Sequence, residues 1–175
     1  MRVPVLLAIF LAAGVSVGAA QHSPYSGDTD REIKALSADE IEGYLGGHGM
    51  GFARVAELNH HPGPKHVLEL AEALSLTAEQ RTQTEAIFAD MHRKATELGR
   101  RLVDTERELD RLFASGDANE ADVRDLIARA GDLEAGLRFA HVEAHLKMKR
   151  ALTPDQVARY DALRGYERHD GHGHN

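Results

Sequence analysis

The chain has 175 residues and a net charge of −7 at pH 7. An acidic chain is a poor partner for nucleic acid, because phosphate binding needs a cationic surface. The sequence contains no cysteine, which excludes disulfide bonds, thiolate metal sites and a cysteine nucleophile. It is poor in aromatic residues and rich in Ala, Leu, Glu and Arg, a composition typical of long helices.

Residues 1–20 have the pattern of a secretory signal peptide. Arg2 is followed by an apolar run that closes with small residues, among them Gly18 and Ala20. The alternative is a retained membrane anchor, because the run is nearly long enough to span a bilayer. The small residues favour cleavage. We therefore predict a periplasmic protein with no membrane span after processing and a mature chain of about 155 residues, enough for one domain.

Polar residues follow the apolar run, and residues 21–36 are expected to form a flexible leader. Three short helices are expected next. Ser37 and Glu40 have the spacing of a capping box, in which each side chain accepts a hydrogen bond from the other residue's backbone. This box predicts the first short helix. The other two are expected over residues 52–59 and 65–74, on either side of a Pro-Gly-Pro turn.

Two long helices are predicted from apolar residues that alternate at spacings of four and three. The stripe of the first helix is Ile87, Met91, Ala95, Leu98, Leu102, Leu109 and Leu112. The stripe of the second is Val123, Leu126, Ala130, Leu133, Leu137, Ala140, Ala144, Met148 and Ala151. Only a short polar segment, residues 115–119, separates them. A short loop between two such stripes predicts a long antiparallel helical hairpin.

A short last helix is expected to begin at Pro154, because proline is well suited to the first helical position. Residues 167–175 are rich in histidine and glycine and are expected to be a disordered tail. Residues 37–166 are therefore predicted to form one all-α domain, in which short helices flank the hairpin.

Two LTxxQ motifs stand at the ends of the hairpin: Leu76-Thr77-Ala78-Glu79-Gln80 and Leu152-Thr153-Pro154-Asp155-Gln156. Because of these two motifs, residues 65–166 resemble the Spy/CpxP family of periplasmic stress chaperones and their heavy-metal-sensor relatives. The resemblance implies a four-helix protomer and a cradle-shaped antiparallel homodimer. Members act as ATP-independent chaperones, restrain sensor kinases, or bind zinc, copper, nickel or cobalt. The motif residues that we expect to be structural helix caps are Thr77, Gln80, Thr153 and Gln156.

The chain departs from this family in its charge. The best-studied chaperone-like members have a positively charged concave face, whereas this chain is acidic overall. Acidic and basic residues nearly balance along the hairpin, and the excess acid lies in the N-terminal third. The sequence therefore gives no support to a cationic surface for clients.

The hairpin carries a candidate metal site. His141 and His145 lie four residues apart on one helix face, with Met148 three residues further on. The register of the hairpin brings His92 to the same level. Imidazole and thioether donors favour zinc, copper, nickel or cobalt over calcium or magnesium. The alternative is that His141 is a packing residue and that His92 and His145 are solvated.

Two further groups of histidines are candidates for metal binding. One group flanks the Pro-Gly-Pro turn and consists of His60, His61 and His66. The alternative for this group is a polar turn without a ligand. The other group lies in the tail and consists of His169, His172 and His174. We expect the tail to bind transition metals weakly and with poor selectivity, because it has no fixed geometry.

The sequence gives no indication of an enzyme. A metalloprotease pattern places its Glu directly after the first His, whereas Glu143 follows His141 by two positions, about 200° round a helix. A nucleophile elbow and a glycine-rich phosphate loop are absent from the sequence. No cofactor is required, and a transition metal (Zn, Cu, Ni or Co) is the candidate ligand.

The leading hypothesis is a periplasmic envelope-stress protein of the Spy/CpxP type. Such a protein would bind unfolded envelope proteins or a membrane sensor protein, with metal as a candidate modulator. The alternative is a periplasmic heavy-metal sensor or metal-buffering resistance protein, and a third interpretation is a structural dimer without a ligand. We expect a homodimer, because Phe88, Val103 and Phe113 widen the apolar stripe beyond what one hairpin covers.

Overall fold

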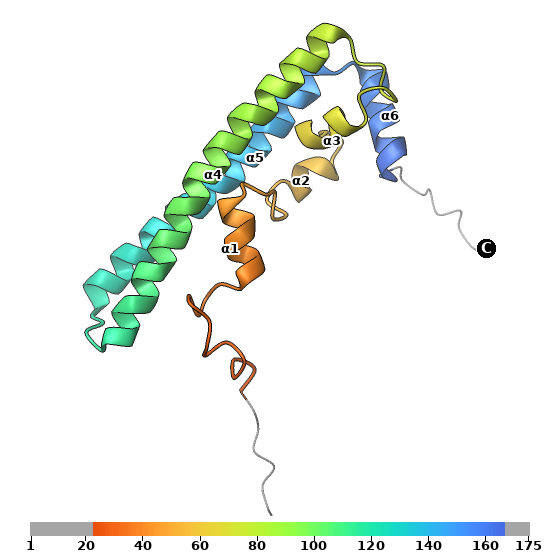
Figure 1. The fold of residues 1–175 in the computed structure, drawn as a ribbon. Coiled ribbons are helices and arrows are strands. Elements are labelled where there is room, and N and C mark those ends of the chain that lie inside the picture. The colour runs from red at the N-terminus through yellow and green to blue at the C-terminus, as the bar shows by residue number, and fades with distance from the viewer. Residues whose placement is uncertain (1–22, 167–175) are drawn as a thin grey trace, which may run out of the picture.

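A computed structural model describes residues 23–166, which form helices and no strand. Two long helices run antiparallel, and four short helices lie on one side of them (Figure 1). In chain order the helices are α1 (Ala38–Leu45), α2 (Arg54–Glu57), α3 (Pro64–Glu69), α4 (Ala78–Ser115), α5 (Glu120–Ala151) and α6 (Pro154–Arg164). The prediction of an all-α fold built on a long hairpin with short flanking helices is confirmed.

Two predicted segments fall outside the described residues: the signal peptide over residues 1–20 and the tail over residues 167–175. Between residues 23 and 166, no helix combines the length and the apolar character that a membrane span requires.

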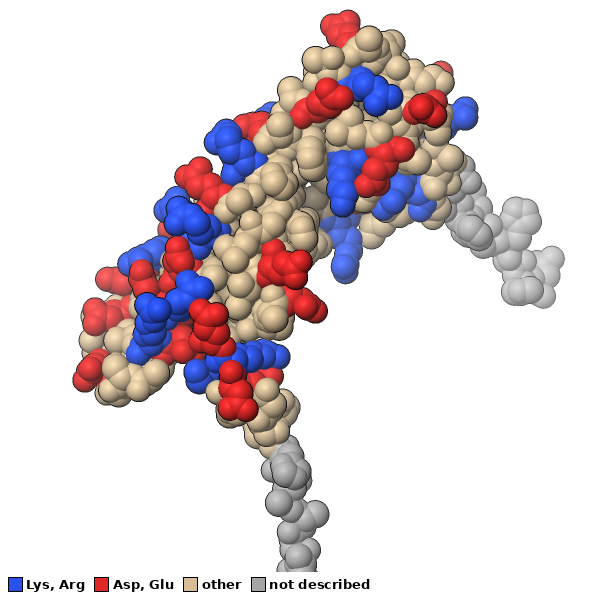
Figure 2. All heavy atoms as spheres, in the orientation of Figure 1, with Lys and Arg blue, Asp and Glu red and all other residues tan. Residues whose placement is uncertain are grey.

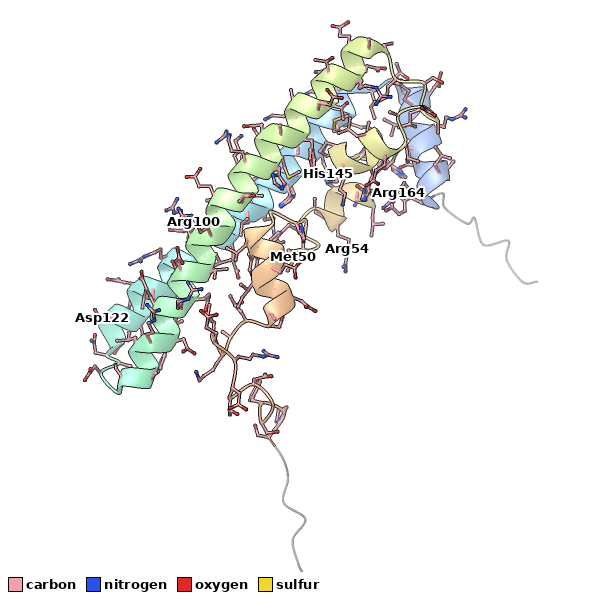
Figure 3. The ribbon with its side chains drawn as sticks, viewed as in Figure 1. Met50, Arg54, Arg100, Asp122, His145 and Arg164 are labelled. Carbon is pink, nitrogen blue, oxygen red and sulfur yellow. The ribbon has the colours of Figure 1, made fainter. Side chains whose placement is uncertain are left out.

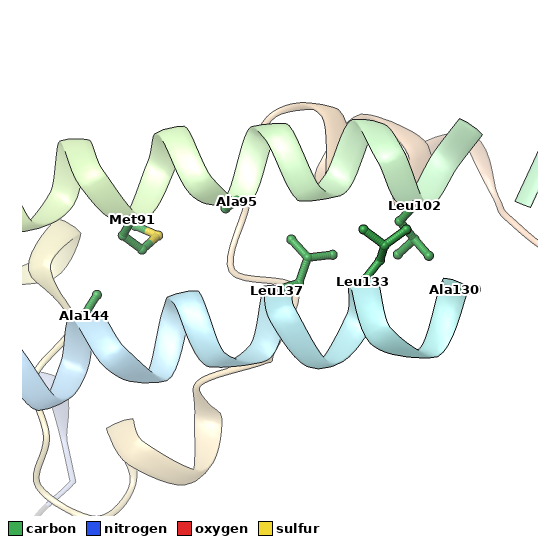
Figure 4. Packing of buried hydrophobic residues seen from close by; sticks show 7 residues of the cluster. All are labelled: Met91, Ala95, Leu102, Ala130, Leu133, Leu137 and Ala144. Carbon is green, nitrogen blue, oxygen red and sulfur yellow. The ribbon is translucent and has the colours of Figure 1, made fainter. Parts of the chain in front are cut away.

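Apolar side chains of α4 and α5 face each other along the hairpin (Figure 4). The buried members of this core are Met91, Ala95, Leu102, Ala130, Leu133, Leu137 and Ala144. Large residues meet small ones, with Met91 lying opposite Ala144, so the helices approach closely. An ion pair of 3.1 Å joins Lys94 Nζ to Glu143 Oε2 across the same seam. The predicted register of the hairpin is therefore confirmed.

The two LTxxQ motifs form capping boxes as predicted. The hydroxyls of Thr77 and Thr153 accept hydrogen bonds from the backbone N–H groups of Gln80 and Gln156, at 3.1 and 3.2 Å. The structure adds a contact between the motifs that the sequence did not predict. Gln80 Nε2 donates to Gln156 Oε1 at 2.7 Å, and Gln156 Nε2 donates to Gln80 Oε1 at 3.0 Å. This amide pair joins the start of α4 to the start of α6.

Each amide of this pair also donates to a backbone carbonyl. Gln80 Nε2 lies 3.0 Å from Ala151 O at the end of α5, and Gln156 Nε2 lies 3.2 Å from Leu74 O, just before α4. The two glutamines therefore bind backbone groups that would otherwise lack a partner where helices end.

Helices α2 and α3 are shorter than the sequence predicted. The predicted ranges were 52–59 and 65–74, whereas the helices are Arg54–Glu57 and Pro64–Glu69. His60 has a φ of 62°, a left-handed conformation that ends the helical path after α2. Neither helix has a side-chain cap at its N-terminus, so tertiary contacts set their limits.

The segment before α1 contributes to a second core. Ile33 and Leu36, which the sequence assigned to the leader, are buried against Val103 of α4. The other end of α1 approaches α4 still more closely. A Cβ placed on Gly99 would lie 2.1 Å from the carbonyl oxygen of Tyr44, so this crossing has room for no side chain at all. These contacts fix α1 on the hairpin.

Candidate functional site

A cleft of about 760 Å³ lies between the hairpin and the short helices. Its rim and walls include Met50, Arg54, His145 and Arg164, which surround the same space in Figure 3. Histidines from several segments line it, namely His48, His66, His92, His141 and His145. The hairpin supplies the last three, the loop after α1 supplies His48, and α3 supplies His66. The fold thus brings together imidazoles that lie far apart in the sequence.

The glycine-rich loop over residues 46–51 forms one wall of this cleft. Gly47 and Gly51 have φ values of 62° and 77°, which glycine adopts without strain. A Cβ on Gly47 would lie 2.7 Å from Thr96 Oγ1, so the loop backbone lies directly on α4. This approach places the carbonyl of Gly46 3.1 Å from His92 Nε2.

Backbone carbonyls orient two of the imidazoles. His145 Nδ1 donates to His61 O at 2.7 Å, and His92 Nε2 donates to Gly46 O at 3.1 Å. Because a neutral imidazole carries one proton, these bonds leave a lone pair on Nε2 of His145 and on Nδ1 of His92. Metal-ligating histidines usually have one ring nitrogen held in this way by a carbonyl or carboxylate.

His141 presents a third ring to the cleft. It is 5% exposed and stacks on Phe52 with the ring centroids 5.9 Å apart. Its Nε2 is buried and, among the described residues, has no hydrogen-bond partner. Buried polar atoms without partners are uncommon in proteins and call for an explanation, such as a bound ion.

Burial keeps two of these rings neutral, those of His141 and His145. Desolvation lowers the pKa of His141 to about 4, and the nearby His145 and His92 add to the shift, whereas a hydrogen bond with the His48 backbone opposes it. Desolvation also lowers the pKa of His145, against the opposing effects of the His61 backbone and of Glu57. Both rings are therefore uncharged at neutral pH, which is the form that binds metal.

Glu57 anchors the base of the cleft. The hydroxyl of Tyr160 donates to its Oε1, and the Nδ1 atoms of His66 and His145 lie 3.5 and 3.4 Å from its carboxylate oxygens. Arg164 Nε lies 3.7 Å from Oε1. Desolvation and the Glu57 hydrogen bond both raise the pKa of Tyr160, so its hydroxyl remains a donor. This buried carboxylate ties α2 to α3, α5 and α6.

The structure gathers only part of the predicted hairpin site. His92, His141 and His145 line one cleft. Met148 does not: it is 0% exposed and lies in a separate core with Val67 and Tyr160. It shares a helix face with His145, but there α3 and α6 cover the hairpin.

The histidines of the turn separate in the same way. His66 lines the cleft, whereas His60 Nδ1 pairs with Asp161 Oδ2 at 2.7 Å. His61 Nδ1 donates to Asn59 O at 2.7 Å, and only its carbonyl contributes to the cleft, through His145. The third group, His169, His172 and His174, lies outside the described residues.

Sequence reasoning missed four residues of the cleft that carry a metal-donor atom: His48, Met50, Glu57 and Met91. The first two lie in a glycine-rich loop without periodicity, and Met91 was assigned to the hairpin core. The donors also lie too far apart for immediate coordination, because within residues 23–166 no three His, Asp or Glu side chains form a group that could hold a metal ion.

The family model described as heavy-metal resistance matches residues 43–159. The chain belongs to this family. The recognition of a Spy/CpxP-like heavy-metal resistance protein from the LTxxQ motifs is thereby confirmed. The matched region of this family member includes all five histidines of the cleft and ends before Tyr160. No curated protein matches the chain significantly, and no solved structure does.

Proposed function

We propose that this member of the heavy-metal resistance family binds a transition-metal ion in the cleft and acts as a periplasmic metal sensor or metal buffer. The observation that carries this proposal is the hydrogen bonding of three imidazoles. His92 and His145 each donate from one ring nitrogen to a backbone carbonyl, and the buried Nε2 of His141 has no hydrogen-bond partner among the described residues. These features support a site that presents unprotonated imidazole nitrogens.

The donor set favours zinc, copper, nickel or cobalt. Imidazole suits all four ions, and the thioethers of Met50 and Met91, which also line the cleft, favour softer ions. Because the described donors form no ready coordination group, a bound ion would have to draw the walls together. The glycine-rich loop with His48 is the wall that could move most easily. Such a movement would give a sensor its response.

Metal titration of substituted chains tests this proposal. His145→Asn keeps an amide N–H in the place of Nδ1, and therefore the bond to His61 O, but removes Nε2. His92→Gln likewise keeps a donor to Gly46 O and removes Nδ1. We expect each change to weaken zinc or copper binding at pH 7.5 at least tenfold, about 1.4 kcal/mol. Isothermal titration calorimetry measures this, with circular dichroism to verify the fold.

His60→Gln is the matched control. This histidine pairs with Asp161 outside the cleft, so its loss should leave metal affinity unchanged. Native-like binding in both His145→Asn and His92→Gln would show that the cleft is not the metal site.

A second candidate function is the binding of unfolded clients or of a sensor protein, with metal as a modulator. Exposed apolar side chains favour it, because Leu45, Val55 and Leu58 lie on the short-helix side of the molecule beside the cleft. Contiguous exposed apolar surface often marks a protein-binding site. If clients bind there, Leu45→Ser with Val55→Ser, two changes outside the lining of the cleft, should abolish suppression of client aggregation. Metal affinity should not change in that variant.

Export is part of this proposal. We expect residues 1–20 to be absent from protein isolated from its native envelope, since the sequence has the charge, apolar run and small residues that signal peptidase requires. Intact-mass spectrometry decides this. A chain that still begins at Met1 would indicate a membrane-anchored protein.

A further inference from the structure

Two walls of different chemistry enclose the cleft. The hairpin wall carries the three imidazoles of the proposed metal site. The short-helix wall carries three cations, Arg54 of α2, Lys65 of α3 and Arg164 of α6. Lys and Arg side chains are visible on this side of the molecule in Figure 2. A ligand in the cleft therefore meets neutral nitrogen donors on one side and positive charge on the other.

The lining of the cleft is cationic, although the chain as a whole has a net charge of −7. Among the described residues, the one carboxylate that lines the cleft is Glu57, which is buried and accepts a hydrogen bond from Tyr160. Three cations against one carboxylate leave a net charge of +2 on the lining when the histidines are neutral. Such a lining repels a bare divalent cation and attracts an anion.

The cations of the short-helix wall have capacity for a ligand. Arg54 and Lys65 are exposed and form no ion pair with any residue between 23 and 166. Arg164 Nε lies 3.7 Å from Glu57, too far for a hydrogen bond, and this buried nitrogen has no hydrogen-bond partner among the described residues. This wall therefore presents donors that a carboxylate ligand would satisfy.

The cleft is also larger than a single ion requires. Its volume of about 760 Å³ lies in the range of sites for small organic molecules. Within residues 23–166, no three His, Asp or Glu side chains form a group that could hold a metal ion. An ion that arrives with its own carboxylate ligand would fill more of the space and would need fewer donors from the protein.

We propose that the cleft binds the transition metal as an anionic chelate, an ion already coordinated by a small polycarboxylate. The imidazoles of the hairpin wall coordinate the ion, and Arg54, Lys65 and Arg164 bind the carboxylates. Imidazole and carboxylate ligands can share one zinc ion. This inference rests on the proposed metal site and specifies the form in which that site takes up its ion.

Zinc and citrate are the probes, used on the full chain at pH 7.5 while a metal buffer holds the free zinc concentration constant. Citrate should raise the affinity for zinc at least about fivefold, and zinc should raise the affinity for citrate by the same factor. Equilibrium dialysis with both probes labelled should find one citrate retained with each zinc. Ethylenediamine is the control ligand, because its zinc complex is cationic and should gain no affinity.

Substitutions on the short-helix wall locate the effect. Arg54→Gln with Lys65→Gln should abolish the increase in zinc affinity that citrate causes. Arg81→Gln with Arg150→Gln is the matched control, since it removes the same charge from two exposed arginines that do not line the cleft, and it should keep the increase. Circular dichroism verifies the fold of both variants.

Other results would overturn the inference. Zinc binding that citrate leaves unchanged at constant free zinc would mean that the cleft takes a bare ion, and the proposed function would survive. Equal retention of citrate with and without zinc would mean an anion site that is independent of metal. Equal loss in the two double variants would mean an effect of overall charge and not of the cleft. Absence of zinc, copper, nickel and cobalt binding, with or without citrate, would refute the proposed function itself.

Discussion

His141 is a buried histidine whose protonation is coupled to folding. Its pKa lies near 4 in the folded chain because burial disfavours the charged ring, whereas an unfolded histidine titrates near 6.5. On acidification the unfolded chain therefore takes up this proton first. The stability that the neutral ring provides is complete above about pH 6.5 and is lost as the pH falls from there toward 4.

We expect the metal-free protein to lose about 2 kcal/mol of folding free energy through His141 between pH 7.5 and pH 5, given its folded pKa of about 4. Burial also lowers the pKa of His145, which adds to the loss in the same direction. Urea unfolding at the two pH values, with a chelator present, measures the effect. In His141→Leu the drop should be smaller by about 2 kcal/mol. An equal drop in both proteins would contradict the assignment.

The residues of the cleft could be predicted from the sequence only where helical periodicity or the register of the hairpin indicated their position. The spacing of His141 and His145 indicated one helix face, and the hairpin register added His92. Glu57 gave no such signal, because it is a single acidic residue in a helix of four residues. Its role depends on Tyr160, which is more than a hundred positions away and approaches only after the chain has folded.

At the level of helices, the contact between the two LTxxQ motifs changes what each of their residues contributes. Thr153 serves only as a cap, and its loss in Thr153→Ala should cost about 1 kcal/mol, as should Thr77→Ala. Gln156 caps the same helix but also binds Gln80 and the carbonyl of Leu74. Gln156→Ala leaves several partly buried polar groups without these partners and should cost about 2 kcal/mol, more than the loss of a cap alone.

Chemical denaturation of Gln80→Ala, Gln156→Ala and the double variant measures the coupling of the two motifs. We expect a coupling energy of at least about 1 kcal/mol, because either change alone breaks the amide pair. Strictly additive losses would mean that each glutamine acts only within its own capping box. Metal affinity should remain native in all three proteins.

The long helices were predictable because an apolar stripe that continues over many helical turns is stable only when a second helix of similar length covers it. The short helices were not predictable in their limits. Segments of four and six residues, such as α2 and α3, are too short to be stable alone, so tertiary contacts decide where they begin and end. Local residue preferences could indicate that these helices exist but not their bounds.

At the level of the whole molecule, the surface that we expect to form a dimer is not the one that the sequence indicated. Val103 is covered within the same chain by Ile33 and Leu36. One row of exposed apolar residues lies on α5: Ala135, Phe139 and Leu146, with the half-buried Val142 between the last two. A second copy of the same helix could cover this stripe.

We expect Phe139→Ser to weaken a dimer at least tenfold, because Phe139 is 64% exposed at the centre of this stripe. Phe113→Ser is the matched control, since Phe113 is similarly exposed, at 59%, but lies at the tip of the hairpin. Light scattering at micromolar concentration compares the two variants with the native chain. A monomeric native protein would refute the dimer, and equal weakening by both changes would refute the choice of surface.

The glycine-rich loop after α1 also determines how metal uptake would be observed. A wall made largely of glycine has much conformational entropy to lose, and backbone segments of this kind open locally more often than the hairpin beside them. Local opening does not require global unfolding, so the melting temperature would report it poorly. Amide hydrogen exchange in residues 46–51 would report it directly, and slower exchange in this loop should be the first sign that an ion has bound.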